Sequence, residues 1–177
     1  MPAQNATRDA NDLSAMVASH LPFLRRYARA LTGNQRSGDA YAVAVLETLI
    51  ADPDLVASQP DGKTALFSVF HSIWVSSGTP VADADGSLDS AAQAHLAALT
   101  PNSREALLLA SIEGFSPDQI GRIMDIPAAE ASRLVDIALR EMEASVRGSV
   151  LVIEDEAIIA MDISAIVEGM GHRVTGT

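Results

Sequence analysis

The stretch SPDQIGRIMDIPAAEASRLVDIALREMEAS, residues 116–145, decides the fold class of the helical part of this 177-residue chain. Ser116 is followed by proline, an acid and Gln119, which is the pattern of a helix start closed by a capping box. The short helix is expected to end at Asp125-Ile126-Pro127, before a longer helix with an apolar face. A short helix, a tight turn and a longer helix are typical of a helix-turn-helix. A generic pair of packed helices has the same pattern and stays the alternative.

Apolar residues recur at helical spacing in several segments before this stretch. We expect a helix from Leu13, a second segment with Pro22 near its first turn and Gly33 after its end, and another helix that begins at Ser37. The run TALFSVFHSIW, residues 64–74, predicts a buried helix, with a strand as the weaker alternative. Further helices are expected over residues 88–99 and 103–112.

The composition changes at two points along the chain. Residues 76–87 are small, polar and acidic, which indicates a linker between two helical modules at about 13–75 and 88–147. The run Val150-Leu151-Val152-Ile153 suits a strand buried on both faces, and an amphipathic stretch and a second strand follow it. The predicted fold class is therefore mainly α, with two helical modules followed by the first β-α-β part of an α/β domain.

The net charge of −11 and the absence of cysteine limit the classes of function. Proteins bind double-stranded DNA mainly by neutralising phosphates with Lys and Arg, so an acidic chain is poorly suited to it. The alternative is that the charge only keeps the protein soluble. Disulfides and cysteine-based zinc sites are excluded. No leader and no apolar run of membrane-spanning length is present, so a soluble cytoplasmic protein is expected.

Three segments resemble parts of known families. Residues 99–143 resemble region 4 of extracytoplasmic-function sigma factors, and residues 21–50, LPFLRRYARALTGNQRSGDAYAVAVLETLI, resemble their region 2. Residues 150–177 are similar to the start of a response-regulator receiver domain. This order is distinctive of the PhyR-type general stress response regulators of alphaproteobacteria. The resemblance implies a sigma-factor-like domain over residues 1–147 and an N-terminal fragment of a receiver domain over residues 148–177.

The resemblance also implies a function, an anti-anti-sigma regulator. In such regulators, phosphorylation of the receiver loosens its hold on the sigma-like domain, which then captures a small NepR-type anti-sigma factor and frees the true sigma factor. The implied partners are that anti-sigma factor, the protein's own receiver, and a sensor histidine kinase or phosphotransferase; no DNA and no membrane partner is expected. Helix-in-groove contacts with the anti-sigma factor are expected at these residues: Tyr41, Val45, Leu49, Glu130, Leu134, Val135 and Ile137.

The residues of the predicted recognition helix favour mimicry over DNA binding. A DNA reader places basic and amide side chains against bases and phosphates. Here Glu130 and Asp136 lie in the helix, and the sequence departs from the basic cluster of sigma region 4. A DNA-binding sigma factor or helix-turn-helix regulator is the alternative. Three aromatic residues of residues 64–74 could stack on single-stranded bases, but we expect them in the core. No catalytic motif occurs, so an enzyme is not predicted.

Two acids follow the first predicted strand. Glu154 and Asp155 match the acid pair of receivers, which implies Mg²⁺ binding in the intact protein, since carboxylates are hard oxygen ligands. A solvated turn with a helix cap is the alternative reading. The phosphoacceptor aspartate of the family is expected beyond residue 177. No catalytic residue and no bound cofactor are therefore expected in this fragment.

Overall fold

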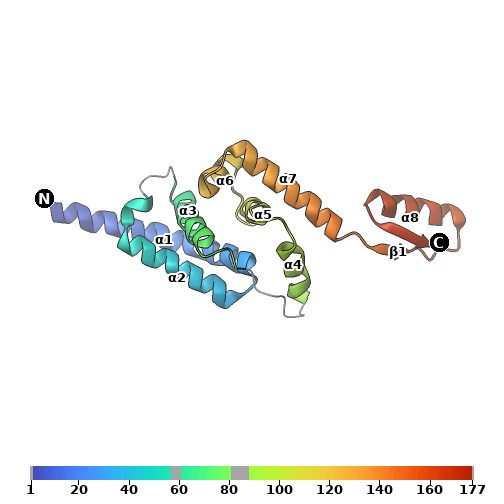
Figure 1. Ribbon diagram of the computed structural model, residues 1–177, viewed down its shortest axis with the longest axis horizontal. Helices are drawn as coiled ribbons and strands as arrows, with labels where there is room; N and C mark the ends of the chain where they lie inside the picture. The colour runs from blue at the N-terminus through green and yellow to red at the C-terminus, as the bar shows by residue number, and fades with distance from the viewer. Residues whose placement is uncertain (1, 57–60, 81–87, 177) are drawn as a thin grey trace.

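A computed structural model describes residues 2–56, 61–80 and 88–176, with side chains described from residue 13 and again from residue 92 after the second gap. The chain is elongated, and α7 leads from a group of packed helices to a small β-α-β piece that lies at one end (Figure 1). Residues 81–87 of the predicted linker lie outside the described residues. The elements are α1 (Pro2–Thr32), α2 (Gln35–Ala51), the 3-10 helix η1 (Pro53–Val56), α3 (Gly62–Ser76), α4 (Leu88–Ala97), α5 (Ser103–Ser111), α6 (Pro117–Met124), α7 (Ala128–Ser145), β1 (Ser149–Leu151), α8 (Ala157–Gly169) and β2 (Arg173–Gly176).

The first half of the helical part consists of α1, α2 and α3. The predicted helix start at Leu13 and the separate segment at Pro22 were wrong, because α1 is one helix that contains Pro22. An apolar face continues past the proline, from Val17 and Leu21 to the buried Leu24, and its packing holds the helix together. Gly33 has the expected positive φ of 72°. The second helix begins at Gln35 rather than at Ser37.

The second half consists of α4 to α7 and contains the predicted helix-turn-helix. Ser116 accepts from the backbone N–H of Gln119 and the Gln119 side chain accepts from the backbone N–H of Ser116, so the capping box is confirmed. Asp125 ends α6 in the left-handed conformation, with φ 56°. Gly121 makes the tight turn possible, since a Cβ there would lie 2.7 Å from the carbonyl oxygen of Ile126.

The two halves share one hydrophobic core. α3 packs against α6 and α1 against α5, and the rings of Phe67 and Phe115 meet at 4.9 Å between centroids. Leu24, Phe70 and Ile120 are buried in the same cluster. Residues 64–74 form the middle of α3, so the prediction of a helix is confirmed and the strand alternative is excluded.

The C-terminal piece is the expected β-α-β unit. β1 and β2 pair in parallel, with Val150 opposite Val174. β1 ends at Leu151, so the predicted strand is shorter than the apolar run, and it is not buried on both faces, because Leu151 is 61% exposed. β2 is the only strand that pairs with β1 among the described residues, so most of the apolar surface of this piece stays uncovered. α8 exposes apolar residues as well, among them Ile158 and Met161.

Candidate partner-binding surfaces and acid pair

The exposed charges of α7 do not form a basic surface. Glu130 makes an ion pair with Arg133 one turn later, so the first cation of the helix is neutralised within the helix itself. Asp136 is exposed on the next turn. Arg140 is exposed two turns after Arg133, and the only charged residue between them is the acidic Asp136. A surface of this kind attracts phosphates weakly, because counterion release requires clustered positive charge.

The apolar residues of α7 divide between core and surface. Leu134 and Val135 are half-buried and pack against the core. Ile137 is 39% exposed and Leu139 is 47% exposed. Of the four partner-contact residues predicted in α7, Ile137 is therefore the exposed apolar one, whereas Glu130 is engaged by Arg133. The role of these residues in binding stays a prediction.

The predicted contact residues of α2 lie largely inside the first half. Val45 is fully buried and Leu49 is 3% exposed, so both belong to the hydrophobic core. Tyr41 is half-buried, and its hydroxyl lies 2.6 Å from the hydroxyl of Ser77. Its ring packs edge-on against Trp74. α2 thus turns Val45 and Leu49 inward, and a role of this face in partner binding stays a prediction.

Sequence reasoning missed the apolar residues on the opposite face of α2. Val43 is 51% exposed and Ile50 is 81% exposed. Together with Leu46 they form a second apolar stripe at spacings of three and four residues, and this spacing was the available signal. Two stripes on one helix leave open which of them faces the core.

The aromatic residues of α3 are core, as expected. Phe67, Phe70 and Trp74 are fully buried, so they are not available to stack on bases. Tyr27 packs against both phenylalanine rings, and burial raises the pKa of its hydroxyl well above the ordinary value. Elsewhere on α3, burial lowers the pKa of His71, whose Nδ1 atom has no hydrogen-bond partner in the part of the chain that the structure describes.

The acid pair follows β1 in the C-terminal piece. Glu154 is half-buried and accepts a hydrogen bond from the backbone N–H of Glu156, while Asp155 is exposed. Their oxygens fit the hard-ligand chemistry of Mg²⁺. Among the described residues no group of three or more acids, histidines or cysteines could hold a metal ion. Two acids alone would be an incomplete ligand set, and Mg²⁺ binding by this pair stays a prediction.

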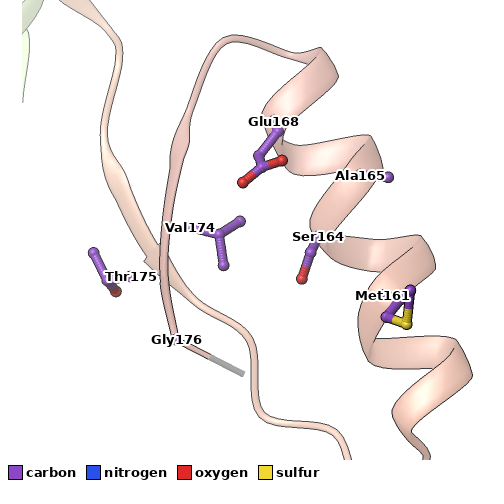
Figure 2. A pocket seen from close by; sticks show the side chains of 7 residues that line it. All are labelled: Met161, Ser164, Ala165, Glu168, Val174, Thr175 and Gly176. Carbon is purple, nitrogen blue, oxygen red and sulfur yellow. The ribbon is translucent and has the colours of Figure 1, made fainter.

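A shallow hollow lies between α8 and β2. Figure 2 shows Ser164 and Glu168 on α8 on the side toward Val174 of β2. The Ser164 hydroxyl donates a hydrogen bond to the backbone carbonyl of Ala160 at 2.7 Å. One carboxylate and one hydroxyl that already donates to the backbone do not form a ligand site. The hollow is therefore the uncovered space between α8 and the edge of the two-stranded sheet.

Comparison with known families gives matches in both halves of the helical part. A family model described as the sigma2 domain of PhyR matches residues 17–71, and one described as the sigma-like domain of the response regulator PhyR matches residues 96–145. None of the helices in the described part of the chain is long and apolar enough to cross a membrane.

Individual relatives give the same result. The phyllosphere-induced regulator PhyR of Methylorubrum extorquens is 45% identical over 161 residues, which cover 91% of this chain and 60% of the relative. The anti-anti-sigma factor PhyR of Bartonella quintana, solved in complex with the anti-sigma factor NepR, matches with a TM-score of 0.75 at 36% identity, covering 93% of this chain and 63% of that one. In the PhyRSL-NepR complex from Sphingomonas sp. Fr1 the match has a TM-score of 0.63 at 43% identity, over 75% of this chain and 87% of that one. The chain thus spans about 60% of the length of the full-length relatives.

Proposed function

The chain belongs to the PhyR family of response regulators, and on this premise we propose that it is an anti-anti-sigma factor that captures a NepR-type anti-sigma factor in the cytoplasm. The proposed activity is binding rather than catalysis. Its effect is the release of a true sigma factor, which the anti-sigma factor holds until this chain competes for it.

The surface of α7 is the observation that carries this proposal. The helix-turn-helix scaffold is complete, with its capping box and tight turn. The charges that would read DNA are neutralised at Arg133 and opposed by Asp136. A retained sigma scaffold without a basic reading surface suits a protein partner that recognises the shape of a sigma factor.

The proposed contacts lie on two exposed apolar surfaces, one in each half. The first consists of Val43 and Ile50 on α2, and the second of Ile137 and Leu139 on α7. An amphipathic helix of the partner can cover each of them with its apolar face. The acidic chain further favours a partner with basic residues around those faces, since complementary charge speeds association.

The C-terminal piece is proposed to be the start of the regulatory receiver. In the longer relatives' arrangement Glu154 and Asp155 would supply oxygen ligands to Mg²⁺ at the phosphorylation site, and a histidine kinase or phosphotransferase would deliver the phosphoryl group. Within residues 1–177 these two acids are a partial site, and the proposed binding of the anti-sigma factor does not depend on them.

Isothermal titration calorimetry tests the proposal with the unphosphorylated chain at about 0.15 M salt, where surface charges are screened beyond about 8 Å. A NepR-type anti-sigma factor is expected to bind, and Ile137→Asp is expected to weaken binding about 30-fold or more, since interface hot spots contribute about 2 kcal/mol or more. Met161→Asp is the matched control, an exposed apolar residue on α8 outside both surfaces. Salt-sensitive binding to promoter DNA by a chain that ignores the anti-sigma factor would favour a DNA-binding sigma factor instead.

A further inference from the structure

Buried carboxylates join the two helical halves at both ends of α5. The side chain of Glu105, at the start of α5, is 1% exposed, and that of Glu113, just after its end, is fully buried. Oε1 of Glu105 accepts from Nε1 of Trp74, near the end of α3, at 3.0 Å. Oε1 of Glu113 accepts from Nε of Arg26 on α1 at 3.0 Å, and Nζ of Lys63, at the start of α3, lies 3.4 Å from the other oxygen. Opposite ends of α3 are thus tied to opposite ends of the α5 segment.

The ammonium group of Lys63 also contacts aromatic rings and the backbone. Nζ of Lys63 lies 4.5 Å from the centroid of Phe115 and 5.1 Å from that of Phe23, within cation–π range. It donates to the backbone carbonyl of Glu113 at 2.8 Å, and Arg26 donates to the carbonyl of Ile112 at 3.0 Å. Cations here satisfy carbonyls that the end of α5 leaves unpaired.

The hydrogen bonds and ion pairs of Glu105 and Glu113 orient the two halves more than they stabilise the fold. Oε2 of Glu105, Oε2 of Glu113 and Nε of Arg104 are buried and have no hydrogen-bond partner among the described residues. Replacing such buried charges with apolar side chains often leaves stability unchanged or raises it. The apolar contact between Phe67 and Phe115 holds the halves together, and directional hydrogen bonds at two separate points further restrict how the halves are oriented.

We infer that Glu105 and Glu113 are positioning residues that fix the distance and angle between α2 and α7. The last step rests on the proposed function: α2 and α7 carry the two surfaces that one partner would cover together. When two linked sites are held at the correct separation, the second contact forms at a high effective concentration. A rigid junction therefore raises affinity without touching the partner.

Spin-label distance measurements on the unbound chain test the geometric part. The chain has no cysteine, so Glu47→Cys on α2 and Arg140→Cys on α7, both at exposed positions, accept labels uniquely. The parent is expected to give one narrow distance distribution. The triple variant combines Lys63→Met, Glu113→Gln and Trp74→Phe, and it removes the indole N–H donor to Glu105 and the ion pairs of Glu113. Its distance distribution is expected to be broader and shifted. Asp39→Asn is the control, since it breaks the ion pair to Arg25 within the first half, and it should leave the distribution narrow.

Binding measured on the same variants without labels tests the consequence. The dissociation constant for a NepR-type partner is expected to rise about 100-fold in the triple variant, the low end of what linked sites gain, and to stay unchanged in Asp39→Asn. If the triple variant fails to fold, Glu113→Gln alone, which keeps the side-chain volume, tests the distance distribution and the binding for the Glu113 end of α5. A narrow, unshifted distribution in a folded variant would overturn the inference. Broadening in a chain whose parent binds no partner would support the positioning role and contradict only the proposed function.

Discussion

Gly38 allows α1 and α2 to pack at a distance that no other residue permits. A Cβ at this position would lie 2.7 Å from the backbone nitrogen of Arg29, 2.9 Å from its Cα and 3.0 Å from the carbonyl carbon of Ala28. All three atoms belong to the backbone of α1, so no side chain can turn away. Gly38→Ala therefore pushes the two helices apart.

The expected loss in unfolding free energy follows from two opposing effects. Alanine in place of glycine in a helix gains up to about 1 kcal/mol, and less near the helix start, where Gly38 lies. Overpacking costs about 1–3 kcal/mol, and the upper part applies because α1 and α2 form the most extensive helix pair of the structure. The net expectation is a loss of about 1–2 kcal/mol.

Urea unfolding followed by circular dichroism measures this loss. The midpoint should fall with little change in the slope, which reports the surface exposed on unfolding. Gly38→Val should cost more than Gly38→Ala, because its side chain adds two further carbons at the same contact. Gly169→Ala is the control, since a Cβ there meets nothing within 4 Å. A stabilised Gly38→Ala variant would refute the argument from close packing.

Three further predictions concern single side chains. Ser116→Ala should lower stability by about 1 kcal/mol in thermal unfolding, because it removes the cap of α6. Phe115→Ala should cost about 3–5 kcal/mol, whereas the 38%-exposed Phe23→Ala should cost clearly less in the same denaturant series. Burial lowers the pKa of His71 below its ordinary 6.5, so the folded state disfavours the protonated imidazole. The free energy of unfolding is therefore unaffected by this group above about pH 6.5 and decreases as the pH falls from there toward the lowered pKa. His71→Gln should therefore flatten the stability profile below about pH 6.5, and an unchanged slope would contradict this.

Local signals in the sequence identified the elements that depend on neighbouring residues. The capping box at Ser116, the left-handed Gly33 and the helix over residues 64–74 were confirmed because capping chemistry and apolar spacing act within a few residues. The β-α-β order was confirmed for the same reason. α1 was divided wrongly because the cost of Pro22 is local, whereas the packing that outweighs it is tertiary.

The candidate site was less accessible to sequence reasoning. α2 carries apolar residues on two faces, and spacing alone does not distinguish the buried Val45 from the exposed Val43. The charges of Glu105 and Glu113 predict solvent-facing positions, since carboxylates are rarely buried without partners. Their partners, Trp74 and Lys63, lie dozens of residues earlier in the chain, so only the folded structure brings them together.

Displacement of a sigma factor from its anti-sigma factor tests the central claim most directly. A preformed complex of a fluorescent sigma factor and a NepR-type anti-sigma factor is titrated with the unphosphorylated chain, and the anisotropy of the sigma factor is followed. The anisotropy is expected to fall to the value of the free sigma factor as the chain takes up the anti-sigma factor, and Ile137→Asp should shift the titration to higher concentration. A chain that leaves the complex intact at saturating concentration, and instead binds promoter DNA, would contradict it.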